Sequence, residues 1–110
     1  MATSGQTQIA DALKLLWQKF LPQMRERIAV LEDANCALEA GSLSEEQRAA
    51  AGAAAHKLAG VLGTFGLAEG TNLAREAEDI CTSDLPIDDL ASSRLHSITE
   101  QLLKLIQTHQ

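Results

Sequence analysis

Aromatic residues, prolines and cysteines are scarce in this chain of 110 residues. It has no tyrosine, one tryptophan and two phenylalanines, with two prolines and two cysteines. Two cysteines cannot supply the disulfide framework of a small secreted domain. Because Cys36 and Cys81 both continue apolar helical stripes, we expect them to be buried, reduced thiols. Runs of β-branched residues with period-two alternation are also rare, which disfavours a β-sheet.

The sequence also lacks a basic cluster and a long apolar run. Fifteen acidic residues against nine basic ones give a net charge of -6, so binding to nucleic acid or to anionic lipid is not expected. No apolar stretch approaches the roughly 20 residues that a membrane span requires, and the first residues lack the regions of a signal peptide. We therefore expect a cytoplasmic protein without membrane contact, whose residues 1–110 form a single domain.

What the sequence does contain is helical periodicity over nearly its whole length. A first, short helix is expected over Ile9–Phe20, because apolar residues recur there at helical spacing until Leu21-Pro22 interrupts them. Proline suits the first position of a helix, so a second helix is expected from Pro22 to the residues before Gly41, which is a plausible C′ residue.

Three further helices are expected after Gly41. The third begins at Ser44, whose capping-box partner is Gln47, and ends at the GTFG sequence of residues 63–66. The fourth carries Leu73, Ala77, Ile80 and Cys81 on its apolar face, and residues 82–86 predict a turn. The last helix shows a bundle-type seam at Ala91, Leu95, Ile98, Leu102 and Leu105, with fraying expected over residues 107–110.

Short connections make successive helices antiparallel neighbours. The predicted fold is therefore all-α: an antiparallel up-down-up-down four-helix bundle with an additional short N-terminal helix.

One histidine, His56, lies in a stretch that is rich in alanine and glycine, AAAHKLAGVLGTFG (residues 53–66). Leu58, Leu62 and Phe65 form the stripe that should face the core. Since Leu58 is about 200° around the helix from His56, the imidazole should point outward. The helical neighbours of His56 have almost no side chain: Ala49, Gly52, Ala53, Ala59, Gly60 and Gly63. A glycine inside a helix costs about 0.8 to 1 kcal/mol relative to alanine, so a compensating purpose is expected.

Two explanations account for this bare stripe. Close packing of another helix predicts a covered histidine, whereas chemical access predicts an open one. An exposed, neutral imidazole offers one nitrogen lone pair as a nucleophile. No Ser/His/Asp or Cys/His set is recognisable, and phosphoryl transfer asks less of the carrier if its partner supplies the metal and the electrostatic stabilisation.

The stretch AHKLAGVLGTFGLAEGTNLAREAEDI resembles the histidine-containing phosphotransfer (HPt) domain. His56, Gly60 and Gly66 match the phosphorylated histidine and the two glycines of that motif, and the predicted helix order is similar to the HPt fold. The resemblance implies a phosphorelay intermediate that accepts a phosphoryl group on His56 from the phosphoaspartate of a receiver domain and passes it to another receiver aspartate. It also implies no ATP-dependent kinase activity, no cofactor of its own, and Mg²⁺ on the partner receiver domain.

The resemblance also implies roles for residues around His56. By spacing, Glu78 matches the Gln or Glu that hydrogen-bonds the other ring nitrogen and orients the ring, although a solvated surface charge is the alternative. Many HPt domains carry a lysine three residues after the histidine, where this chain has Ala59, so Lys57 and Arg75 become the candidates to stabilise the phosphoryl group. The surface on which receiver domains dock is expected to comprise Gly52, Ala53, Ala59, Gly60 and Gly63.

Two other classes of function compete with phosphotransfer. A non-catalytic helical module could dock or oligomerise through the same small residues, with His56 incidental. A metal-binding bundle has little support, because the histidines and cysteines lie far apart in sequence. His96 and His109 are expected to be solvated surface residues.

Overall fold

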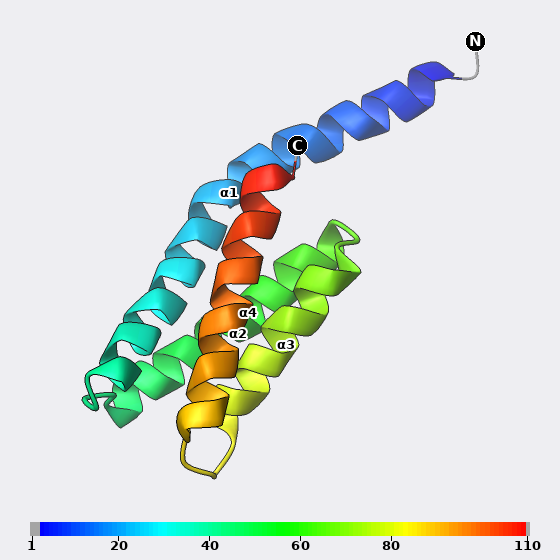
Figure 1. Cartoon of the computed structure of the whole chain (residues 1–110). Coiled ribbons are helices and arrows are strands. Elements are labelled where there is room, and N and C mark those ends of the chain that lie inside the picture. Colours follow the sequence, from blue (N-terminus) through cyan, green and yellow to red (C-terminus); the bar gives the residue numbers. More distant parts are fainter. Residues whose placement is uncertain (1–2, 110) are drawn as a thin grey trace.

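The computed structural model describes residues 3–109 and contains, over that range, four helices: α1 (Thr3–Glu39), α2 (Glu45–Thr64), α3 (Ala68–Thr82) and α4 (Asp89–Thr108). Each helix packs against the next one in the chain, and α4 closes the ring by packing against α1. Figure 1 shows successive helices running in opposite directions. The predicted all-α four-helix bundle is therefore confirmed.

The prediction of a separate N-terminal helix is wrong, because α1 continues through Pro22. Proline lacks an N–H group and its ring crowds the carbonyl four residues earlier, which bends a helix where packing prevents it from ending. Trp17 and Met24, on either side of the proline, are only 3% and 1% exposed. Figure 1 shows α1 changing direction between its blue first half and its cyan second half. Packing on both sides of Pro22 thus holds one bent helix together.

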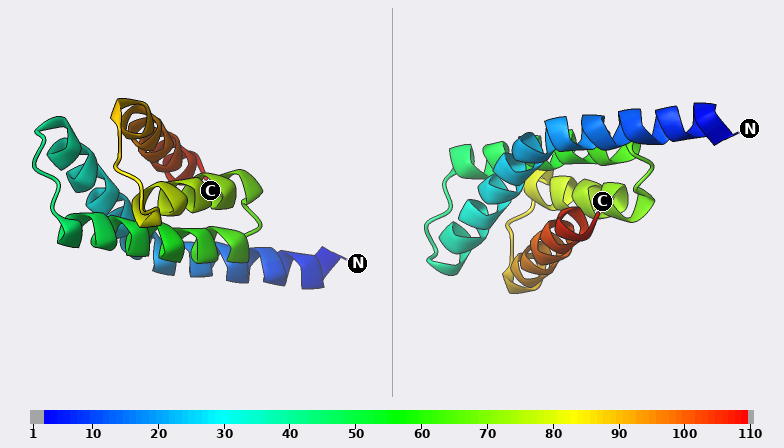
Figure 2. Two further views of the ribbon diagram at one scale, coloured as in Figure 1. Left: turned by 90° about the horizontal axis from the view of Figure 1, so that it is seen from below. Right: turned by 90° about the horizontal axis from the view of Figure 1, so that it is seen from above.

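The first half of α1 extends beyond the bundle. Figures 1 and 2 show its N-terminal end standing clear of the other three helices. Ile9 and Leu13, which belong to the apolar repeat of this segment, are 64% and 45% exposed. No helix in the described part of the chain is long and apolar enough to cross a bilayer.

The predicted ends of the central helices are confirmed. Gly41 and Gly66 have positive φ angles of 68° and 71°, which favour glycine and end α1 and α2. Ser44 Oγ accepts from the Gln47 amide at 3.0 Å, while Gln47 Oε1 accepts from the Ser44 amide at 2.9 Å. The second glycine of the HPt-like motif therefore has a structural purpose, since it turns the chain from α2 into α3.

The sequence predicts no starting residue for helix α4 and predicts fraying at its end. Asp88 is its N-cap, which the sequence analysis did not identify, and its carboxylate accepts from the Ala91 amide at 2.8 Å. The helix continues through Thr108 without the fraying expected from Gln107, and Gln110 lies outside the described residues.

The core lies along the axis of the bundle and is aliphatic. Its largest fully buried side chains are those of Met24, Ile28, Leu31, Leu58, Leu62, Leu95, Ile98, Leu102 and Ile106. Cys81 is buried as predicted, but the prediction of a buried Cys36 is wrong, because this thiol is exposed. Ala34 and Asn35 occupy the buried positions in that turn of α1, at 2% and 6% exposed, and Cys36 falls outside them.

The three aromatic residues of the chain gather at one end of the bundle. Phe65, at the end of α2, contacts Trp17 edge-on with ring centroids 5.0 Å apart, and Phe20 at 6.4 Å. His109 stacks on Trp17 at 4.1 Å. The prediction that His109 is simply solvated is therefore wrong, whereas His96 is exposed and pairs with Glu100 at 3.0 Å on the surface of α4.

Candidate functional site

His56 projects from the middle of α2 into solvent, with 73% of its side chain exposed. Leu58 and Leu62 on the same helix are 1% and 0% exposed, so the predicted division between a core stripe and an outward imidazole is confirmed. A covered histidine, which packing alone predicted, is contradicted. The ring is open to a reactant.

Glu78 of α3 holds one nitrogen of this ring. Its Oε2 atom lies 2.8 Å from His56 Nδ1, and the Glu78 side chain is 27% exposed. A carboxylate can only accept a hydrogen bond. For this bond to form, Nδ1 must carry the proton and donate the hydrogen bond to Glu78. In the neutral ring, the lone pair is then on Nε2, which Glu78 does not contact. A contact of this kind can hold one ring orientation and the tautomer that has its proton on Nδ1.

Small residues on one side of His56 let α3 approach closely enough to form this pair. Gly52, four residues before His56, is buried, and a Cβ atom there would lie 3.0 Å from Thr82 Cγ2 of α3. Ala59, three residues after His56, is 6% exposed. Both residues belong to the α2–α3 interface, which corrects the expectation that they line an open surface.

Small residues on the other side of His56 remain open. Ala53 and Gly60 are exposed, and a Cβ atom added at Gly60 would meet nothing within 4 Å. Gly63 is also exposed, although it lies on the α3 side of His56, with Thr71 Oγ1 of α3 3.6 Å from its would-be Cβ. Close packing thus explains the small residues on the α3 side, Gly52 and Ala59, and chemical access is consistent with the exposed ones, because His56 lies at the boundary between the α3 contact and solvent.

Comparison with known proteins assigns the chain to a family. The Hpt domain family matches residues 15–108. The chain belongs to this family. It is also 33% identical over 76 residues to protein RcaC from Microchaete diplosiphon, an alignment that spans 69% of the chain and 12% of RcaC. The chain therefore covers about an eighth of the length of that relative. No solved structure matches the chain.

Membership of the Hpt family implies histidine phosphotransfer in a phosphorelay. It also implies receiver domains as partners, and is consistent with an intermediate that has no kinase activity of its own. Within the described residues 3–109, no group of three or more His, Cys, Asp or Glu side chains is arranged to hold a metal ion.

The two candidate cations of this Hpt domain lie on different sides of His56. Lys57 lines a groove between α1 and α2, away from Glu78. Arg75 is exposed on α3, one helical turn before Glu78. No described hydrogen bond or ion pair joins either cation to His56.

Sequence reasoning missed Arg48, which connects the start of α2 to the end of α3. Its guanidinium donates to four backbone carbonyls, those of Cys81 at 2.8 Å, Ile80 at 3.3 Å, Ser83 at 2.6 Å and Leu85 at 2.7 Å. The carbonyls of Ile80 and Cys81 belong to the last turn of α3, where a helix leaves carbonyls without partners, and those of Ser83 and Leu85 follow the helix. Arg48 thereby anchors the helix that carries Glu78, through contacts so distant in sequence that no local pattern indicates them.

Proposed function

We propose that this Hpt domain carries a phosphoryl group on Nε2 of His56, between the aspartates of two receiver domains. The observation that carries the proposal is the open imidazole whose Nδ1 proton is held by Glu78 at 2.8 Å. That hydrogen bond leaves the Nε2 lone pair free on a side chain that is 73% exposed.

In the proposed reaction, the Nε2 lone pair attacks the phosphorus of an aspartyl phosphate on a receiver. The Nε2–P bond forms as the P–O bond to the aspartate breaks, and the electron pair of that bond returns to the carboxylate. The Nδ1 proton stays between the ring and Glu78, whose negative charge stabilises the positive charge that develops on the imidazole. The same steps in reverse phosphorylate the second receiver.

The chain's own contribution is to present and orient the ring, while Mg²⁺ on the receiver is expected to stabilise the phosphoryl oxygens. Lys57 and Arg75 flank His56 from opposite sides, and we propose that a cation stabilises the phosphoryl group from one of these positions. Ala53, Gly60 and Gly63 form the proposed docking surface, because their small side chains let the receiver approach His56. Gly52 and Ala59 support that surface from beneath by seating α3 against α2.

The test is transfer from a phosphorylated receiver domain to the wild type and to His56→Gln. The wild type is expected to gain label and the variant none, with equal helix content by circular dichroism. His96→Gln is the matched control, because His96 is also an exposed helical histidine with a carboxylate partner. Transfer that persists in His56→Gln, or label that is lost in His96→Gln, would contradict the assignment.

The competing hypothesis is a non-catalytic docking or oligomerisation module in which His56 is incidental. It predicts that the wild type binds receiver domains, or itself, without gaining label from any of them. The exposed ring and its oriented tautomer favour phosphotransfer, because neither feature is needed for a docking surface of small residues.

A further inference from the structure

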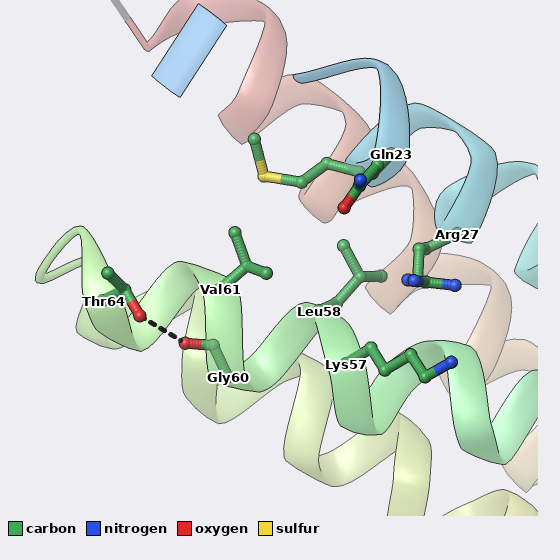
Figure 3. A pocket seen from close by; sticks show the side chains of 8 residues that line it. Gln23, Arg27, Lys57, Leu58, Gly60, Val61 and Thr64 are labelled. Carbon is green, nitrogen blue, oxygen red and sulfur yellow. Dashed lines mark hydrogen bonds between the residues drawn. The ribbon is translucent and has the colours of Figure 1, made fainter. Parts of the chain in front are cut away.

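A groove lies between α1 and α2, on the side of α2 that faces away from Glu78 (Figure 3). Its cavity volume is about 270 Å³, and Leu58 and Val61 of α2 form part of its apolar lining together with Met24 of α1. Gly60, one helical turn after His56, also lines it. The groove is therefore continuous with the open strip on which a receiver is proposed to dock.

Two cations face each other across this groove, Arg27 from α1 and Lys57 from α2. Figure 3 shows the guanidinium and the ammonium group at the same end of the groove. No carboxylate lines the groove, and neither cation forms an ion pair with any residue in the described range 3–109.

The positions three and four residues from each cation on its own helix also hold no acid. These positions are Gln23, Met24, Val30 and Leu31 around Arg27, and Ala53, Ala54, Gly60 and Val61 around Lys57. Two unneutralised cations thus line one groove in a chain whose net charge is -6. Such an arrangement is complementary to an anionic group that the chain itself does not supply.

We propose that this groove binds a glutamate side chain of the receiver domain, and that Arg27 is a specificity-determining residue for the partner. The two methylene groups of a glutamate would pack on the apolar lining, while its carboxylate pairs with Arg27 and Lys57. Inorganic phosphate would leave the apolar lining without a contact. The proposal rests on the phosphotransfer function. A receiver that docks over His56 also covers the groove, because the groove is continuous with the open strip beside that residue.

A receiver held in this way contacts α2 along the open strip and also in the groove beside it. The contact fixes the register in which its aspartate meets Nε2, and a receiver with a lysine at that position is repelled. Arg27 itself touches no reacting atom, so its effect should appear in the encounter with the receiver rather than in the chemical step.

The experiment compares Arg27→Glu with Arg25→Glu, an equal charge change at an exposed position on the same helix that does not line the groove. A panel of phosphorylated receiver domains is screened first, and those that transfer to the wild type are used. Arg27→Glu is expected to lower kcat/KM at low salt by at least about tenfold, mainly through KM, and Arg25→Glu by less than about threefold. Arg27→Gln should lose an intermediate amount of kcat/KM. High salt should reduce the differences in kcat/KM between the wild type and all three variants.

Phosphoramidate separates docking from chemistry, because it phosphorylates a histidine directly and releases ammonia without a receiver. Arg27→Glu is expected to lose far more of its transfer from the receiver than of its labelling by phosphoramidate. Exchanging acidic residues on the receiver for lysine, one at a time, should identify one glutamate whose replacement restores transfer to Arg27→Glu.

Two failures are distinguishable. If the wild type accepts no label from any receiver, the phosphotransfer function is wrong. If the wild type accepts label, but Arg27→Glu behaves like Arg25→Glu or no glutamate exchange restores transfer, phosphotransfer stands and the proposed glutamate site is overturned.

Discussion

At the scale of single residues, the site depends on one hydrogen bond between two helices. Glu78 approaches His56 only because Gly52 and Ala59 allow α3 to lie close to α2. The imidazole itself is open, so the proposed nucleophile is exposed while Glu78 contacts the ring from one side.

Replacing Glu78 should test this orienting role. Glu78→Leu removes the acceptor of the Nδ1 proton and is expected to slow single-turnover transfer by about tenfold, which corresponds to about 1.4 kcal/mol. Glu78→Gln keeps an acceptor oxygen and should retain most of the rate. The ¹⁵N chemical shifts of the His56 ring report the tautomer, which should become mixed in Glu78→Leu and stay fixed in Glu78→Gln.

Asp79→Asn is the control for Glu78, because it removes the neighbouring carboxylate without touching the ring. A rate in Glu78→Leu equal to that of Asp79→Asn, with an unchanged tautomer, would show that Glu78 does not orient His56.

Gly60 tests the open surface on the other side of the histidine. Gly60→Ala is expected to raise the free energy of unfolding by up to about 1 kcal/mol, because alanine favours the helix and its Cβ atom meets nothing within 4 Å. Gly60→Arg should remain folded but lose at least about tenfold in transfer, since a long side chain would occupy the proposed docking surface. Urea denaturation and transfer assays measure the two effects, and wild-type transfer by Gly60→Arg would contradict this surface.

At the scale of helices, Arg48 replaces the capping that α3 lacks at its C-terminus. Arg48→Leu leaves the carbonyls of residues 80, 81, 83 and 85 without this donor. We expect a loss of about 2 to 3 kcal/mol in the free energy of unfolding, measured by urea denaturation. Because α3 carries Glu78, transfer should slow as well.

The exposed pair between Arg94 of α4 and Glu76 of α3 provides the comparison. The hydrogen bond from Arg94 lowers the pKa of the Glu76 carboxyl below its ordinary value of 4.5. The stability that the pair contributes is therefore present above that ordinary pKa, and it is lost as the pH falls through the lowered pKa of the folded protein. Arg94→Gln should therefore matter less than Arg48→Leu at pH 7. An equal or larger loss in Arg94→Gln would reverse this ranking.

Local periodicity predicted the helices of the bundle, their caps at Gly41 and Ser44, and the outward direction of His56. It failed where the outcome depends on residues distant in sequence. Packing of Trp17 and Met24 carries α1 through Pro22, and the position of α3 decides that Gly52 is buried while Gly60 is open. Arg27 and Lys57 line the same groove because of how α1 lies beside α2, and no motif in the sequence indicates this.

At the scale of the whole molecule, the Hpt family match leaves out the first turns of α1. The family match begins at residue 15, and Ile9 and Leu13 are largely exposed beyond the bundle. Deleting residues 1–14 should change the free energy of unfolding by less than about 1 kcal/mol, because residues 8–14 are all exposed. Transfer should persist, and a loss above about 2 kcal/mol would show that this segment belongs to the folded unit.

The position of phosphorus on the wild-type protein tests the central claim most directly. After incubation with a phosphorylated receiver, ¹H–³¹P correlation spectra distinguish phosphorus on Nε2 from phosphorus on Nδ1 and from any other residue. We predict a single phosphohistidine at His56, with phosphorus on Nε2 and the Nδ1 proton retained. Phosphorus on Nδ1 of His56, or on another side chain, would contradict the account.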